Sequence, residues 1–177
     1  MQGVLKWDHR YNIVKSLACA IRYLHEEWEE HVIHRNITSS AIYIDPDMNP
    51  RLGYMAPEYM EVGEATTMAD IYSFGVVVLE VVSGRKAVDF RRPEVLLVKR
   101  VHESEGYEGN YEELVDPRLD GEYNRKELVR LVKLAMTCTQ SNPELRPTMR
   151  MVVSVLDGHD RCFTEEGQNE STKFSTN

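Results

Sequence analysis

The segment DIYSFGVVVLEVVS, residues 70–83, constrains the fold most, because it is apolar on nearly every side. Its length favours a helix, with Thr67 and Asp70 as a capping box at its start and Gly84 at the position where helices stop. Its β-branched valines would also suit a buried strand. A helix without a polar face has to lie inside a domain. Residues 70–83 are therefore expected to form a buried helix.

The spacing of apolar residues predicts further helices over residues 8–30, 93–103, 124–139 and 148–156. Asp8 is the expected N-cap of the first of them. One face of this helix carries a row of apolar positions, which are Val14, Leu17, Ala18, Ile21, Leu24 and Trp28. Such a face is typical of a helix that packs on a core.

Between these helices, residues 32–52 follow a different pattern. The stretch AIYID alternates, and DPDMNPRL is typical of a turn that leads into another short strand. After Gly158 the chain is polar, and the tail 158–177 is expected to be disordered. The prediction is a single domain, residues 1–157, with a mainly α fold and one small β hairpin.

Composition narrows the functional classes. The chain has 177 residues and a net charge of -8, which argues against a general nucleic-acid binder. Its cysteines, Cys19, Cys138 and Cys162, are odd in number and form no CxxC pair, so reduced thiols are expected rather than a zinc site or a disulfide framework. No apolar run approaches the ~18 residues that a membrane span needs, so an intracellular chain without a span is predicted.

Several sequence motifs indicate the functional class of the chain. HRNITSSA, residues 34–41, resembles the protein-kinase catalytic loop H-R-D-L-x-x-x-N, and YMAPEY, residues 54–59, contains A-P-E. DIYSFGVVVLE and CTQSNPELRPTM, residues 70–80 and 138–149, resemble two later signatures of the larger kinase lobe. With YLHEEWEEHVIHR and LVDPRLDGEYNRKEL, the chain resembles plant receptor-like serine/threonine kinases, most nearly the lectin-receptor-like group, over about residues 3–157.

The resemblance implies the C-terminal lobe of a kinase domain and the parts that phosphoryl transfer needs. The family binds ATP and magnesium with a Gly-rich loop, a strand lysine and a helix glutamate. No G-x-G-x-x-G and no V-A-I-K occurs in this sequence. The N-terminal lobe is therefore expected to be missing, and no cofactor is predicted.

The catalytic loop, by this resemblance, has lost its working groups. Asn36 stands where the family has its catalytic Asp, and a neutral carboxamide does not accept a proton near neutral pH. Ala41 stands at the metal-binding Asn, and a methyl group cannot coordinate magnesium. Thr38 replaces the usual lysine, so a phosphate partner is lost. No competent catalytic or metal-binding residue is predicted.

A gap follows the loop. In the family the stretch like MNPRLG leads into DFG and an activation segment, but here it runs straight into YMAPEY at Leu52, Gly53 and Tyr54. The activation segment is thus expected to be missing, and Arg35 would lack the phosphate that it can pair with in the family. A skipped exon, a damaged gene and a faulty gene model would each produce this junction.

The retained motif residues have structural interpretations. The resemblance implies that Glu58 forms a salt bridge with Arg146 and that Asp70 ties the catalytic loop through backbone hydrogen bonds. His34 is expected to be a packed residue rather than an acid or base. Trp7, Trp28 and Tyr72 are expected in the core rather than at a binding platform, as are Met149 and Met151.

Three hypotheses follow. The first is a catalytically inactive pseudokinase that acts as a protein-interaction module in receptor-kinase signalling, on the cytoplasmic side of the plasma membrane, with receptor-like kinases as partners. The second is an active ATP-dependent serine/threonine kinase, which is the family-level activity. The third is a non-functional gene-model fragment without a stable fold.

Overall fold

The computed structural model describes residues 4–28, 33–34, 37, 66–87, 97–103 and 111–159. The regular structure in these residues is helical. The α-helices are α1 (Trp7–Arg22), α3 (Thr67–Ser83), α4 (Leu97–Glu103), α5 (Arg125–Cys138) and α6 (Met149–Leu156). A π-helical turn, η1 (Tyr23–Glu27), continues α1, and the 3-10 turns are η4 (Tyr111–Leu114), η5 (Pro117–Leu119) and η6 (Pro143–Leu145). The mainly α fold is confirmed; the expected hairpin and residues 160–177 lie outside the described residues.

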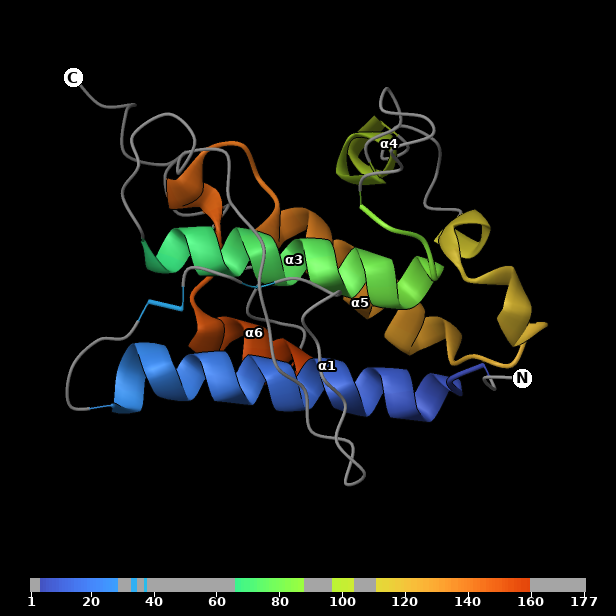
Figure 1. Ribbon diagram of the computed structural model, residues 1–177, viewed down its shortest axis with the longest axis horizontal. Helices are drawn as coiled ribbons and strands as arrows, with labels where there is room; N and C mark the ends of the chain where they lie inside the picture. The colour runs from blue at the N-terminus through green and yellow to red at the C-terminus, as the bar shows by residue number, and fades with distance from the viewer. Residues whose placement is uncertain are drawn as a thin grey trace, which may run out of the picture.

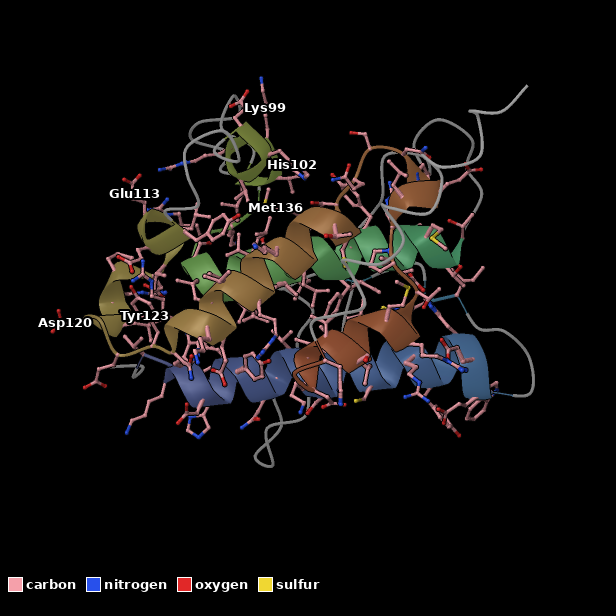
Figure 2. The ribbon with its side chains drawn as sticks, turned by 180° about the vertical axis from the view of Figure 1, so that it is seen from behind. Lys99, His102, Glu113, Asp120, Tyr123 and Met136 are labelled. Carbon is pink, nitrogen blue, oxygen red and sulfur yellow. The ribbon has the colours of Figure 1, made fainter. Side chains whose placement is uncertain are left out.

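The helices form two layers. Figure 1 shows α3 and α1 in front, and Figure 2, from behind, shows α5 and α6 in front of them. The main contacts cross between the layers, because α3 packs against α5 and α1 packs against α6. The short helix α4 stands at one corner, above α3 and α5 (Figure 1). The core between the layers contains the fully buried side chains of Leu17, Ile21, Ile37, Ile71, Phe74, Val77, Leu128, Leu131, Leu134 and Met149.

Helix α3 is the buried helix that the sequence predicts. Only a few of its residues are even half-exposed. Gly75 permits its close approach to α5, because a Cβ there would stand 2.7 Å from the Cβ of Cys138 and 2.8 Å from Cγ2 of Thr139. Cys138 itself is fully buried, and this burial raises the pKa of its thiol far above the usual range. A reactive thiol at this position is thereby excluded.

Identifiable capping residues determine where α3 begins and where it ends. Thr66, in extended conformation, is the N-cap, and its Oγ1 accepts from the Ala69 N–H at 3.1 Å. The predicted capping box from Thr67 was therefore wrong by one residue. Gly84 ends the helix as predicted, with a left-handed φ of 63°.

Helix α1 begins one residue before its predicted cap. Lys6 is the N-cap and makes no side-chain capping bond, while Asp8 lies in the first turn. The Asp8 cap was therefore wrong. Trp7 is buried as expected; its Nε1 donates to Oε2 of Glu127 at 2.7 Å. Trp28, in contrast, is 52% exposed, so the expectation that it lies in the core was wrong. The π-helical turn ends at Glu27 and Trp28 has an extended backbone, so its side chain does not continue the apolar face of α1.

An ionic cluster of Arg10, Asp116 and Arg118, hereafter the ionic clasp, binds the C-terminal end of α3. Arg10 is buried and donates from Nη2 to Oδ2 of Asp116 at 2.6 Å and from Nη1 to the Val81 carbonyl at 2.8 Å. Arg118 donates to both carboxylate oxygens, at 2.9 and 2.8 Å. The Asp116 N–H donates to the Val82 carbonyl at 3.0 Å. The clasp thus joins α1, α3 and η5.

The electrostatics of the clasp favour an ionised Asp116. Burial alone would raise the pKa of this carboxyl, but the hydrogen bonds from Arg118 and Arg10 outweigh it and hold the pKa well below its usual range. Gly84 is part of the same arrangement. A Cβ at Gly84 would collide with the Asp116 carboxylate and stand 2.7 Å from Nη2 of Arg118.

Candidate functional site

Asp70 lies at the centre of the candidate site, in the first turn of α3, where it is 1% exposed. Its Oδ2 lies 3.0 Å from Nε2 of His25 and accepts a hydrogen bond from the backbone N–H of His34 at 2.8 Å. A carboxylate only accepts, so Nε2 of His25 is the donor. Asp70 therefore links the end of α1 to the backbone at the start of the catalytic-loop motif.

His25 reaches Asp70 from η1. The turn carries it inward, and it is 7% exposed. Glu26, its neighbour, faces another helix, since its Oε2 accepts from Nε and Nη2 of Arg150 at 3.0 and 2.9 Å. The sequence did not indicate a role for His25, because the spacing of apolar residues says nothing about which buried polar groups meet.

His34 is half-buried. Its backbone N–H donates to Asp70, while its ring atom Nδ1 is buried and has no hydrogen-bond partner. A general acid or base needs an orienting partner and access to a substrate. Within the described residues, the His34 ring has no orienting group of this kind at Nδ1.

Arg146 is almost completely buried, between η6 and α6. Its Nη1 donates to the Met68 carbonyl at 2.8 Å and its Nε to the Gln140 carbonyl at 2.9 Å. Its guanidinium also stands 4.9 Å from the centre of the Tyr72 ring, within reach of a cation–π contact. Arg146 thus anchors the start of α3, and Tyr72 is half-buried beneath it.

The other predicted site residues, Arg35, Asn36, Thr38, Ala41 and Glu58, lie outside the described residues. The bond between Glu58 and Arg146 therefore stays a prediction. No group of three potential metal ligands occurs in the part of the chain that the structure describes. The side chains of Asn36 and Ala41 offer one amide oxygen between them, whereas magnesium prefers carboxylate and amide oxygens together, so the loss of the metal site also stays a prediction.

A pocket of about 360 Å³ opens beside His25, at the end of the bundle where α3 and α6 begin. Its walls are largely apolar, and its lining residues are His25, Glu26, Thr67, Met68, Ile71, Thr148 and Met149. No sequence pattern indicated this pocket, because three segments far apart in the chain form it. Next to it, Tyr23 and Trp28 are about half exposed and contact each other edge to face, with ring centres 5.6 Å apart.

Comparison with known proteins places the chain in a family. Residues 43–156 match the family of protein tyrosine and serine/threonine kinases. The chain is 52% identical over 200 residues to receptor like protein kinase S.2 of Arabidopsis thaliana, and the match covers 95% of this chain and 24% of that protein. It is 36% identical to the L-type lectin-domain containing receptor kinases IV.3 of Arabidopsis thaliana and SIT1 of Oryza sativa, covering 87% and 88% of this chain and 27% of each relative.

The relatives differ from this chain in length. The chain spans about a quarter of the length of these relatives. The alignment with the first is 200 residues long, longer than the 177-residue chain, so that relative has residues without a counterpart here. Among the described residues, no helix is long and apolar enough to cross a membrane. The resemblance read from the motifs is confirmed: this chain belongs to the protein tyrosine and serine/threonine kinase family, with receptor-like and lectin receptor kinases of plants as relatives.

Proposed function

We propose that this chain is a catalytically inactive kinase-like module that acts by binding other proteins in receptor-kinase signalling. The observation that carries the proposal is the pair of substitutions in the catalytic-loop motif, Asn36 at the position of the Asp and Ala41 at the position of the metal-binding Asn. Either one removes a group that phosphoryl transfer needs, and the effects of groups that act as a unit do not compensate for each other.

The junction at Gly53 and Tyr54 supports the same conclusion. The sequence passes from RLG to YMAPEY without a DFG motif, and the relative's surplus residues agree with a segment that is missing inside this chain. The DFG Asp is the second magnesium ligand of the family's mechanism. Its loss would leave no carboxylate to hold the metal.

The buried polar groups at the start of α3 support a folded scaffold rather than a collapsed remnant. Asp70 is hydrogen-bonded to His25 and His34, which are 45 and 36 positions away, and Arg146 to the Met68 carbonyl, 78 positions away. Such bonds stabilise a fold whether or not it catalyses a reaction. Since the relatives are receptor kinases, we propose kinases of this class as partners and the cytoplasmic side of the plasma membrane as the location.

A thermal melt with and without magnesium-ATP tests the proposal. A ligand that binds the folded state raises the melting temperature by mass action. We expect a cooperative melt that magnesium-ATP does not move, and no phosphotransfer by the Asn36→Asp variant. The kinase domain of an active relative serves as the positive control. A magnesium-dependent rise in the melting temperature, or activity of the variant, would overturn the proposal.

The second candidate is an active serine/threonine kinase, which membership of the family and 52% identity to a named receptor kinase favour. Incorporation of labelled phosphate by the unmodified chain with magnesium or manganese would support it. A melt without cooperativity would instead favour the third hypothesis, a fragment without a stable fold.

A further inference from the structure

Trp28 lies in an unexpected place. The apolar spacing of α1 puts it on the same face as Ile21 and Leu24, yet it is 52% exposed. In the described residues its aromatic contact is with Tyr23, which is itself 46% exposed. A large apolar side chain on a core-type position therefore lies on the surface.

The cause is η1. Its closing bond runs from the Trp28 N–H to the Tyr23 carbonyl, five residues back, at 3.1 Å. In an α-helix, side chains three and four positions apart are neighbours. The wider turn shifts this pairing to five, so Tyr23 and Trp28 meet edge to face at an interplanar angle of 79°. Single π-helical turns are rare and occur frequently at functional sites.

The pocket lies beside this turn. His25 and Glu26 line it on one side, and Met68, Ile71 and Met149 supply apolar walls on the other. In an uninterrupted α-helix, Trp28 would follow Leu24 by four positions and His25 by three, and it would lie on the face that His25 now presents to the pocket. The volume of about 360 Å³ is within the range of small-ligand pockets and is large enough for an indole ring.

We propose that η1 is a two-position switch. In the position seen in this structure, the turn is π-helical and Trp28 packs on Tyr23 at the surface. In the other position, the turn continues as an α-helix and the Trp28 indole fills the pocket. The two positions exchange a surface aromatic pair and a π-type bond for burial of the indole and an α-helical bond. This inference does not depend on whether the chain transfers phosphate.

The two positions of η1 differ in their effect on the candidate site. His25 lies inside η1 and donates to Oδ2 of Asp70, the same oxygen that accepts from the His34 N–H. A change in the turn moves His25, and a moved His25 changes the bond that Asp70 offers to His34. The position of Trp28 is thereby coupled to the backbone at the start of the catalytic-loop motif.

The experiment uses the full chain labelled with 5-fluorotryptophan. Because the chain contains two tryptophans, two ¹⁹F signals are expected, and Trp28→Phe assigns them. The shift of each signal between H₂O and D₂O reports the exposure of its indole. Buried Trp7 is the internal control in the same sample. In the unmodified chain, the Trp28 signal should show the larger solvent shift.

Substitution of Tyr23 tests the two positions. Tyr23→Ala removes the surface pair, and we expect it to favour the inserted position by roughly two- to tenfold, the worth of one aromatic contact. The solvent shift of Trp28 should then fall and that of Trp7 stay constant. Tyr23→Phe keeps the ring and is the matched control, with no expected change.

A second substitution separates insertion from other movements. Met68→Phe fills the pocket, so adding it to Tyr23→Ala should restore the large solvent shift of Trp28. A Trp28 signal that is the same in Tyr23→Ala and Tyr23→Phe would overturn the proposal, as would an unchanged effect of Tyr23→Ala when the pocket is filled. The surface location of Tyr23 makes its variants suitable, and cooperative melting checks that each is folded.

Discussion

The two ends of helix α3 differ in the contacts of their buried polar groups and in how closely they are packed. At the C-terminal end, the ionic clasp donates hydrogen bonds to the Val81 and Val82 carbonyls, and its Asp116 carboxylate lies against Gly84. At the N-terminal end, Asp70 is also buried, but the ring of His34 has an unpartnered nitrogen, and a pocket and a surface tryptophan lie close by. Each charged group of the clasp has a partner, although Oε2 of Glu80, towards the same end of α3, is buried without one. The pocket and the exposed tryptophan are therefore what distinguish the N-terminal end.

The contrast separates residues that make the fold from residues that a site would use. A cluster in which every charge is paired gains nothing from movement, so it fixes the chain in one arrangement. Unfilled volume and unpaired polar atoms cost free energy, and proteins retain them mainly at functional sites. Buried polar contacts at both ends of α3 stabilise the fold, so they do not depend on whether the chain transfers phosphate.

The largest expected effect comes from breaking the clasp. Asp116→Ala leaves the buried guanidinium of Arg10 without its counter-charge, which should lower the free energy of unfolding by about 3–5 kcal/mol. Urea denaturation of the purified variant measures it. Arg118→Gln is the matched control: the Arg118 side chain is 59% exposed, so its loss should cost far less. Equal effects from the two variants would contradict a clasp centred on the Arg10–Asp116 pair.

Gly84 offers the next test. Gly84→Ala forces a side chain into a left-handed conformation and against Asp116, so we expect a loss of about 2–4 kcal/mol in the free energy of unfolding. Gly121→Ala is a matched control, since Gly121 has a φ of 82° but open space around its Cβ position. Its cost should be about 1 kcal/mol. The difference between the two variants isolates the contact with the clasp.

At the other end of α3, Asp70→Asn should cost about 1–3 kcal/mol, because the amide oxygen replaces only part of the acceptor capacity of a buried carboxylate. Amide hydrogen exchange adds a local measurement. The His34 N–H should exchange faster in the variant, while the Asp116 N–H, bonded to Val82 at the far end, should not change. Faster exchange at both ends would mean that the two ends are not independent.

The sequence predicted the helices well because their causes are local. The apolar stretch 70–83, Gly84 and the helix over 124–139 each depend on residues close together in the chain. The cap of α3 was missed by one residue because Thr66 and Thr67 are equally good caps, and packing of the helix decides between them. The exposed Trp28 was missed because a π-helical turn has no signature in apolar spacing.

The contacts of the candidate site were harder to foresee. Motif resemblance pointed to Asp70 and Arg146, but not to His25, whose partner is 45 positions away. The clasp was invisible for the same reason, since Arg10 and Asp116 are separated by 106 positions. Charged residues in a sequence are usually solvated, and only the assembled helices show which of them are buried together.

Acid should weaken the clasp, because it protonates Asp116. The folded-state pKa of Asp116 is held below its unfolded value of about 3.9. Its contribution is therefore present above that unfolded pKa and is lost as the pH falls through the folded-state pKa. Between pH 5 and pH 2, stability should fall by up to about 1.4 kcal/mol per pH unit for this one group. Asp116→Asn should show a flatter pH dependence; the same slope as the unmodified chain would exclude Asp116 as the source.

The smallest expected effect separates buried from exposed charge. Nζ of Lys15 lies 2.7 Å from Oδ1 of Asp157 and links α1 to the end of α6. The hydrogen bond between them raises the pKa of Lys15 and lowers that of Asp157. Both side chains are more than a third exposed, so Lys15→Met should cost only about 0.5 kcal/mol.

High salt concentration distinguishes the exposed Lys15–Asp157 pair from the buried clasp, because mobile ions screen exposed pairs much more than buried ones. In ~1 M sodium chloride, where the screening length is about 3 Å, the cost of Lys15→Met should disappear, while the cost of Asp116→Ala should persist. A double-mutant cycle of Lys15→Met with Asp157→Asn, at low and high salt, measures the pair alone. If the coupling survives high salt, the Lys15–Asp157 pair is as protected as the clasp, and exposure does not distinguish the two.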